Sequence, residues 1–390
     1  MRKLFPTYRF RYTDFLLLGL VVCLNLIGIA AIGSASPERQ PRQIQGMILG
    51  LVLCLFCSTI DYKKVLRWYW LWYGISFLAL LAVIAAGVTR GGATRWFSIG
   101  GFQFQPSEAA KLLLILFYAK FIMKYKNRMK SFGFLALCLL IAAPQLFLIY
   151  QEPDLSTTIM VAVILAGMLF VGGMSGKLAA GIVVVAVPSA VIFLNLVVQE
   201  GSTLLDDYQR GRILAWLHPE DYATTIAYQT MNSIMAIGSG QLLGKGYNTN
   251  EISSLLNSGY ISESQTDFIF TVIGEEFGFI GACIVVLLLA LVAIRLFWTA
   301  RETKDTAGAV LTAGVGTWIG FQGFMNIAVA TGVGPNTGIP LPFVSYGLTS
   351  LLCLYAGLGF VMNVRMQNKQ QHRQAFDMGV NIYDYRTDRT

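Results

Sequence analysis

Apolar runs long enough to cross a lipid bilayer recur along almost the whole chain. A helix needs about 20 apolar residues to span the hydrocarbon core, and we predict ten spans, at approximately 15–33, 44–60, 68–88, 107–123, 132–150, 155–173, 177–199, 268–298, 306–331 and 343–364. Only 13% of the 390 residues are charged, about half the fraction of a soluble protein. Backbone groups in lipid must pair within helices or a closed barrel, and long apolar runs favour helices. We therefore expect an all-α polytopic membrane protein with about ten transmembrane helices.

Basic residues in the loops indicate the orientation of the chain, because cytoplasmic loops of membrane proteins are rich in Lys and Arg. One side would hold 21 of the 29 Lys and Arg, so both termini are predicted to be cytoplasmic. The chain then divides into a leader at 1–14, a membrane domain at 15–364 and a cytoplasmic tail at 365–390. One large extracytoplasmic loop, 200–265, belongs to the membrane domain.

Composition also excludes several classes of function. The net charge of +8 comes from the short loops, a pattern that indicates membrane orientation and not nucleic-acid binding. All six cysteines fall inside apolar runs, and there are only two histidines. Zinc sites built on His and Ser-His-Asp catalysis are therefore not supported, and no nucleotide-binding loop is present.

The stretch 263–276 carries Glu263, Asp267, Glu275 and Glu276 at the start of an apolar run. Carboxylates beside lipid are costly, so the cluster indicates either chemistry on a polar headgroup or solvation of a helix start. In one continuous helix, Asp267 would lie about 14 Å further out than Glu276. Asp267 is thus the candidate for chemistry, Glu275 and Glu276 are candidates for orientation or ion pairing, and Glu263 is expected to be solvated.

Other outer segments add polar candidates. Glu108 and Lys111 are three residues apart at the start of a helix, where an ammonium in an apolar helix needs a partner. Trp96 is either an interfacial aromatic or part of a site. Asp154 either caps the following helix or belongs to the site.

The large loop contains Arg210, Arg212 and Lys245, and its segment 228–246 is predicted to form an interfacial or re-entrant amphipathic helix that ends in a Gly-rich turn. The last outer loop, 332–347, has three prolines and ends near Ser345 and Tyr346. Such irregular backbone at membrane depth must be buried in protein or line a wet cavity.

These carboxylates and cations meet on the outer side, which suits a lipid-linked substrate with a diphosphate and sugars. Lys and Arg would hold the diphosphate, with a divalent cation (Mg or Mn) as an open possibility, and a carboxylate would act as general base. A single direct displacement would invert the anomeric configuration.

Five segments carry a resemblance to a known family. They are Gly-Ala-Thr-Arg-Trp-Phe with Phe-Gln-Pro-Ser-Glu-x-x-Lys (ending at Lys111), Glu-Pro-Asp-Leu-Ser-Thr (152–157), Ala-Ile-Gly-Ser-Gly with Gly-Lys-Gly (236–246), Glu-Ser-Gln-Thr-Asp-Phe-Ile-Phe with Gly-Glu-Glu (263–276), and Asn-Thr-Gly-Ile-Pro-Leu-Pro-Phe-Val-Ser-Tyr-Gly (336–347). Together they resemble the SEDS family (shape, elongation, division and sporulation), which includes RodA, FtsW and SpoVE. The last segment looks more like RodA than FtsW. Two departures, Gln265 where His is frequent and Leu348 where Gly is frequent, leave the implied catalytic groups intact.

The resemblance implies a peptidoglycan glycosyltransferase of the bacterial cytoplasmic membrane that polymerises lipid II (undecaprenyl-diphosphate-linked disaccharide peptide). It implies a class B penicillin-binding protein as partner, with a role in cell shape, division or sporulation. The catalytic carboxylate falls on Asp267. Substrate-binding positions are predicted at Lys111, Glu108, Trp96, Asp154, Arg210, Arg212 and Lys245, with supporting positions at Glu275, Glu276, Ser345 and Tyr346.

Two alternatives of other classes stay open at this point. A lipid II flippase would need a polar route across the bilayer, whereas charge is concentrated at one surface. A non-catalytic membrane scaffold for a penicillin-binding protein would tolerate substitutions in the acidic cluster.

Overall fold

The structure is a computed structural model that describes residues 12–90, 93–99, 102–199, 204–248 and 263–377. Most of the predicted leader, the end of the tail and parts of the large loop lie outside these ranges, as do the glycine pairs at 91–92 and 100–101. In the described part of the chain, a helix of 17 residues or more lies in each of the ten predicted ranges. These helices are α1 (Phe15–Ala35), α2 (Gln40–Thr59), α4 (Tyr69–Ala86), α5 (Pro106–Lys124), α6 (Phe132–Gln151), α7 (Leu155–Val171), α8 (Gly176–Val198), α11 (Ile269–Glu302), α12 (Thr306–Ala330) and α13 (Leu348–Asp377).

Seven helical segments among the described residues are long and apolar enough to cross a membrane, judged by length and composition. The segments that contain α5, α7 and α12 are not among them. α12 contacts α5, α7, α11 and α13, so it is enclosed by protein and need not present an apolar surface to lipid. The chain is thus a multi-helix membrane protein, and the count of ten crossings stays a prediction.

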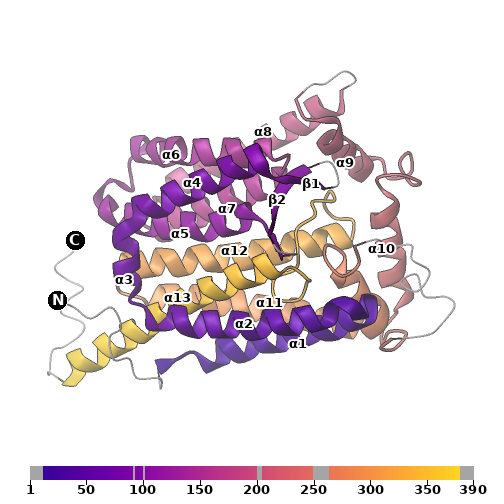
Figure 1. Cartoon of the computed structure of the whole chain (residues 1–390). Coiled ribbons are helices and arrows are strands. Elements are labelled where there is room, and N and C mark those ends of the chain that lie inside the picture. The colour runs from indigo at the N-terminus through magenta and orange to yellow at the C-terminus, as the bar shows by residue number, and fades with distance from the viewer. Residues whose placement is uncertain (1–11, 91–92, 100–101, 200–203, 249–262, 378–390) are drawn as a thin grey trace.

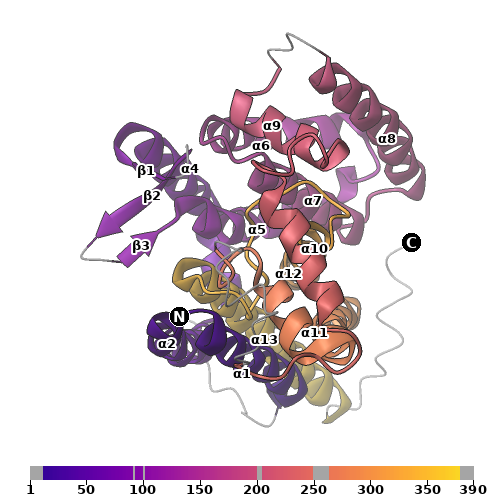
Figure 2. The ribbon, with the colours of Figure 1, turned by 90° about the vertical axis from the view of Figure 1, so that its right-hand side faces the viewer.

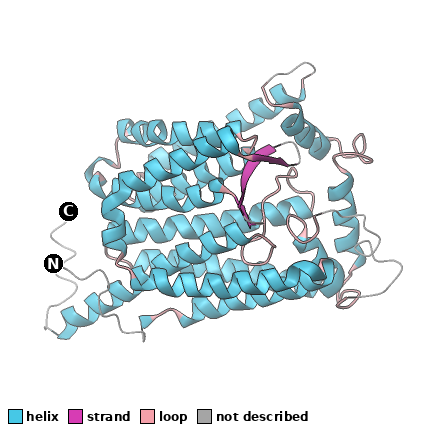
Figure 3. Ribbon diagram, in the orientation of Figure 1, coloured by secondary structure: helices cyan, strands magenta, loops and turns pink. Residues whose placement is uncertain are grey.

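The long helices run alongside one another as a bundle, and the longest connections between them lie at one end, which we call the polar end (Figure 1). The start of α1 and the end of α13 lie together at the opposite end. At the polar end lie the short helices α9 (Asp207–Leu217) and α10 (Tyr228–Ser239), while α3 (Tyr62–Val65) lies at the other. Figure 3 shows the strands and the long α12–α13 loop at the same end as α9 and α10.

A small sheet at the polar end is a feature that the sequence did not predict. It consists of β1 (Val88–Arg90), β2 (Ala93–Ile99) and β3 (Phe102–Phe104), paired antiparallel in the order β1-β2-β3. Phe97 faces Phe104 and Val88 faces Trp96 in the register. Because successive side chains of a strand point to opposite faces, β2 directs Arg95 and Trp96 to different sides.

The core of the bundle and its edge differ sharply in burial. Most residues of α12 are buried, including Trp318, whereas Val197 is the one buried residue of α8. α8 lies at the side of the bundle in Figure 2, with apolar side chains such as Val184 exposed. Lipid would cover these side chains in a membrane.

Three boundaries differ from the predicted ones. α13 begins at Leu348 and not at 343, because Phe343 has a φ of 64°, which is incompatible with a helix. α13 also passes the predicted tail boundary at residue 365 and ends at Asp377. α11 is broken at Gly278, where φ is 64° and ψ is −163°. The continuous helix assumed for the height of Asp267 above the membrane is therefore wrong.

Candidate active site

Asp267 lies two residues before α11, with its backbone held by α12 and the α12–α13 loop. Its carbonyl accepts a hydrogen bond of 2.8 Å from Nδ2 of Asn326, which also donates to the Ile339 carbonyl at 2.7 Å. The preceding carbonyl, of Thr266, accepts from Ser345 Oγ at 2.6 Å. Asp267 is thus fixed by its main chain, which leaves the carboxylate available for other contacts.

Gly338 brings the α12–α13 loop against this carboxylate. A Cβ atom at Gly338 would lie 3.3 Å from Oδ2 of Asp267 and 3.8 Å from Nη1 of Arg212. Gly338 also has a φ of +67°, a conformation that glycine adopts without strain. Glycine at this position therefore allows Arg212 of α9 and Asp267, just before α11, to approach the same point of the loop.

The electrostatics of Asp267 suit a base that works near neutral pH. Desolvation raises the pKa of its carboxyl to about 6, Arg212 and Arg95 lower it, and Glu263 and Asp154 raise it. The pKa of Arg212 is lowered, first by desolvation and in part by Arg95. Its guanidinium also stacks 4.4 Å from the centre of the Tyr208 ring. Arg212 is therefore the predicted cation that the structure places beside Asp267.

Arg95 is a second cation of the site, and the sequence analysis did not select it. Its side chain is buried, its Nη1 lies 3.8 Å from Asp154 Oδ2, and its Nε donates to the Glu152 carbonyl at 2.9 Å. It also donates to the Pro153 carbonyl. The motif Gly-Ala-Thr-Arg-Trp-Phe contained the signal, since this arginine is next to the selected Trp96 in a predicted outer segment.

Asp154 caps α7, which is one of the two roles that the sequence left open, and it also pairs with Arg95. Its carboxylate caps α7, accepting from the Thr157 backbone N–H at 3.0 Å and from Thr157 Oγ1 at 2.9 Å. The same carboxylate pairs with Arg95. The pKa of the neighbouring Glu152 is raised to about 9, chiefly by desolvation and in part by Asp154, while Arg95 opposes the shift. A carboxyl with such a pKa is uncharged at neutral pH, and Asp154 is the carboxylate that pairs with Arg95.

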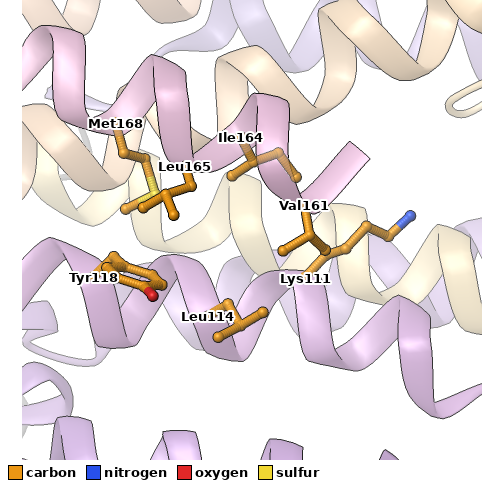
Figure 4. Close-up of a pocket in the computed structure, with 7 residues that line it drawn as sticks. All are labelled: Lys111, Leu114, Tyr118, Val161, Ile164, Leu165 and Met168. Carbon is orange, nitrogen blue, oxygen red and sulfur yellow. The ribbon is translucent and has the colours of Figure 1, made fainter. Parts of the chain in front are cut away.

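Lys111 and Glu108 form a buried ion pair of 2.6 Å. Lys111 Nζ also donates to Gln322 Oε1 at 3.1 Å and lies 5.0 Å from the centre of the Trp318 ring. Its aliphatic stem lines a recess of about 10 Å³, with the ammonium pointing away from the other lining side chains (Figure 4). The ammonium is thus enclosed in this conformation, and its contact with a diphosphate stays a prediction.

The remaining predicted cations lie in other contacts. Arg210 donates to the carbonyls of Val197 and Gln199 at 3.0 and 2.9 Å, which ties α9 to the end of α8. Lys245 pairs with Glu275 at 2.8 Å. The structure thus gives both cations partners away from Asp267, at the end of α8 and at Glu275.

Glu275 and Glu276 belong to a junction between the 240–246 turn and the break in α11. The backbone N–H groups of Lys245 and Gly246 donate to the carbonyls of Glu275 and Glu276 at 2.9 and 3.0 Å. The Glu276 carboxylate accepts from Ser34 Oγ and from the Asn248 backbone N–H. These contacts match the ion-pairing and orienting roles expected of the two glutamates, while exposed Glu263 matches the expected solvation.

The supporting residues hold the loop around Asp267. Ser345 Oγ accepts from the Leu341 N–H at 2.7 Å in addition to its bond with Thr266, and the Tyr346 N–H donates to the Gln265 carbonyl at 2.9 Å. Trp96 is half-buried in β2. Asn326 and Gln322, which donates to the Pro340 carbonyl at 2.9 Å, were missed by the sequence analysis. Their signal was two amides four residues apart in an apolar helix, hence on one face.

Among the described residues, no group of three or more His, Cys, Asp and Glu side chains is placed to hold a metal ion.

Comparisons with known proteins extend over nearly the whole chain. Residues 7–370 match the FtsW/RodA/SpoVE family model, described as "Cell cycle protein". The chain belongs to this family. It is 35% identical to the peptidoglycan glycosyltransferase MrdB of Escherichia coli K12 over 92% of this chain and 95% of that protein. It is 33% identical to the "Probable peptidoglycan glycosyltransferase FtsW" of Haemophilus influenzae, over 91% of each.

Solved structures show the same fold. A chain of a peptidoglycan synthase complex that coordinates polymerization and crosslinking matches with a TM-score of 0.75 and 30% identity, over 92% of this chain and 99% of that one. The rod-shape-determining protein RodA of Thermus thermophilus matches with a TM-score of 0.65 and 27% identity, over 90% and 96%. Because the MrdB and FtsW identities nearly coincide, the RodA-like branch stays a prediction.

Proposed function

We propose that this protein is a peptidoglycan glycosyltransferase that polymerises lipid II into glycan strands. Relatives of similar length carry that activity in their names, at 33–35% identity. The observation that carries the proposal is the position of Asp267, a carboxyl with a pKa of about 6 beside Arg212 and near Arg95. Such a group is largely ionised at neutral pH and retains the basicity to accept a proton.

In the proposed step, Asp267 accepts the proton of the GlcNAc 4-hydroxyl as that oxygen attacks the MurNAc anomeric carbon. The bond from that carbon to the diphosphate breaks, and undecaprenyl diphosphate leaves with the electron pair. Direct attack from the opposite face inverts the anomeric centre. Arg212 and Arg95 offer guanidinium donors for the diphosphate, whose charge grows as it leaves.

The orientation proposed for this reaction places both termini in the cytoplasm and the site at the outer face of the bacterial cytoplasmic membrane. Two observations support it. Most Lys and Arg lie in the leader, the tail and alternate loops, and the described ends of the chain lie at the end of the bundle opposite α9 and α10 (Figure 1). The test is labelling of single cysteines placed in each loop with a membrane-impermeant reagent.

A class B penicillin-binding protein is the proposed partner. The support is the similar chain from a peptidoglycan synthase complex that couples polymerization to crosslinking. Co-purification with such a protein and its effect on glycan synthesis test this part of the proposal.

We also propose a divalent cation, Mg or Mn, as a component of the site. Mg²⁺ is commonly held by one or two carboxylates together with substrate phosphates. Asp267 is the charged carboxylate that the structure offers beside the two arginines, whereas Asp154 is engaged by Thr157 and Arg95. Bound to a diphosphate, such an ion would neutralise charge. Removal with a chelator, followed by measurement of lipid II binding and of polymerisation, tests its participation.

The deciding experiment uses purified protein and lipid II in detergent or nanodiscs, with glycan length read on gels. We expect Asp267→Asn to reduce the rate about 10²- to 10⁴-fold, the usual contribution of a general base. Glu263→Gln is the matched control, because Glu263 is an exposed carboxylate of the same segment, and it should retain activity. Full activity of Asp267→Asn would refute the assignment. Transbilayer movement of lipid II without polymer would favour the flippase.

A further inference from the structure

A cavity of about 60 Å³ opens beside the proposed site, between the end of α9, the start of α10 and the beginning of the α12–α13 loop. On this measure one water needs roughly 10–15 Å³, so the cavity accommodates a group of about four or five heavy atoms. Its walls include the apolar side chains of Met231 and Ile234 and the indole of Trp216. Trp216 is held in place because its Nε1 donates to the Gly332 carbonyl at 3.2 Å.

One polar group on the wall lacks a partner. Oδ1 of Asn336 is buried and has no hydrogen-bond partner among the described residues. A buried acceptor without a donor is unfavourable, and a ligand that brings an N–H group would satisfy it. The cavity thus combines an apolar surface with one amide, a combination that fits a small group with a methyl and an N–H.

Two of the elements that line the cavity, α9 and the α12–α13 loop, also carry residues next to Asp267. Trp216 is four residues after Arg212 on α9, so the two side chains share a face and lie about one helical turn apart. Asn336 precedes by two residues Gly338, the glycine that lies against the Asp267 carboxylate and Arg212. The same two elements therefore line the cavity and carry Arg212 and Gly338, which lie next to the proposed base.

We propose that this cavity binds the acetamido group of the acceptor GlcNAc, the sugar whose 4-hydroxyl is deprotonated by Asp267. This inference rests on the proposed function and names a specificity pocket for the same site. The acetamido N–H would donate to Asn336, its methyl would contact Met231 and Ile234, and the sugar ring would lie against Trp216. The acetamido group and the 4-hydroxyl stand on ring carbons two positions apart, a span comparable to one helical turn.

The cavity selects the acceptor GlcNAc over the donor MurNAc on chemical grounds. MurNAc carries a lactyl peptide on the carbon next to its acetamido group, and a cavity of about 60 Å³ has no room for that substituent. GlcNAc carries a hydroxyl there. Binding of the acetamido group would fix which ring edge of the acceptor faces Asp267, and so which hydroxyl is deprotonated.

Two variants test the cavity in the polymerisation assay. Asn336→Leu removes the acceptor, and Ile234→Trp fills the space, with Met235→Trp as matched control, since Met235 is the next residue of α10, is exposed and is not part of the wall. We expect the first two to raise the acceptor KM about five- to tenfold, the effect of one lost hydrogen bond. The control should match wild type, and thermal unfolding confirms that each variant is folded.

A second substrate separates specificity from a general defect. Lipid II with a free amine on GlcNAc should be a poor acceptor for the wild type, and Asn336→Leu should discriminate much less between the two substrates. If Asn336→Leu and Ile234→Trp are folded, retain the wild-type KM and discriminate as the wild type does, the acetamido assignment is refuted while the polymerase activity stands.

Binding without turnover gives an independent readout. Tryptophan fluorescence of the full chain is titrated with N-acetylglucosamine and with glucosamine, and Trp216→Phe identifies the contribution of Trp216 among the seven tryptophans. We expect a change that only the acetylated sugar produces and that Trp216→Phe and Ile234→Trp abolish. A wild type that binds N-acetylglucosamine in this way but makes no glycan would contradict the proposed function and support the pocket. A wild type that makes glycan without such a response would count against the pocket.

Discussion

Replacement of Arg212 by glutamine should move the acidic limb of the polymerisation rate to higher pH. Asp267 must be deprotonated to act as a base, and the pKa of its carboxyl is about 6. About 90% of it is then ionised at pH 7 and about 10% at pH 5. We therefore expect kcat/KM of the wild type to fall roughly tenfold per pH unit below pH 6.

The sign and size of the shift follow from the charges around Asp267. Arg212 is the largest influence that lowers this pKa, ahead of Arg95, while Glu263 and Asp154 raise it. A nearby opposite charge lowers a carboxyl pKa by about 1–3, so its removal should raise the Asp267 pKa to about 7 or above. At pH 7 only about half of Asp267, or less, would then be ionised. Loss of diphosphate binding would add a reduction that does not depend on pH.

The assay is the initial rate of lipid II polymerisation between pH 5 and 9. Arg212→Lys is the control, since it keeps the positive charge and should keep the limb near pH 6, even if the rate falls. Arg95→Gln should move the limb in the same direction by less. A limb that stays in place or moves to lower pH in Arg212→Gln would refute the assignment of Asp267 as the base.

Three further predictions concern stability and Glu152. Lys111→Met leaves the buried Glu108 carboxylate without its counter-ion, so this substitution should lower the free energy of unfolding by about 3–5 kcal/mol. The double variant with Glu108→Gln should regain much of the lost thermal stability. A double variant as unstable as Lys111→Met alone would contradict this. Gly278→Ala should lower the unfolding temperature, because its φ is +64° and a Cβ would collide with the Gly244 nitrogen; Gly320→Ala, where a Cβ has ordinary space, should be tolerated. Glu152→Gln should keep activity near wild type at pH 7, because a carboxyl with a pKa of about 9 is already neutral there. Since that pKa is raised above its ordinary value of 4.5, wild-type stability should fall between about pH 5 and 9, and the variant should lose less over that range in thermal unfolding.

The acidic segment shows how far sequence reasoning reached into the site. Sequence reasoning selected Asp267 and predicted that Glu275 and Glu276 have structural contacts. The basis was that a carboxylate near lipid is unfavourable unless it has a partner or a function. Sequence reasoning also assumed a continuous helix and so missed the break at Gly278. A lone glycine in an apolar run carries no mark of a break. The helix breaks at Gly278 because the 240–246 turn packs there: the carbonyls of Gln241 and Leu242 accept hydrogen bonds from the N–H groups of Phe279 and Ile280.

Four cations on the outer side were predicted together, yet the structure separates them. Arg212 lies beside Asp267, Lys245 pairs with Glu275, Arg210 holds the end of α8, and Lys111 is enclosed with Glu108. The positions of charged residues can be read along the chain, whereas the partner of each charge depends on which helix ends meet.

The amino-acid sequence by itself determined the helical membrane architecture and which segments carry the polar residues. Lipid imposes both, because it requires long apolar helices and penalises charge at every position independently of the neighbours. Only the tertiary structure decided that Arg212 and Asp267 approach the same point at Gly338, that Arg95 pairs with Asp154, and that Asn326 holds the backbone of Asp267. These contacts join residues far apart in the chain, and they exist only where packing of the bundle brings the ends of different helices to one place.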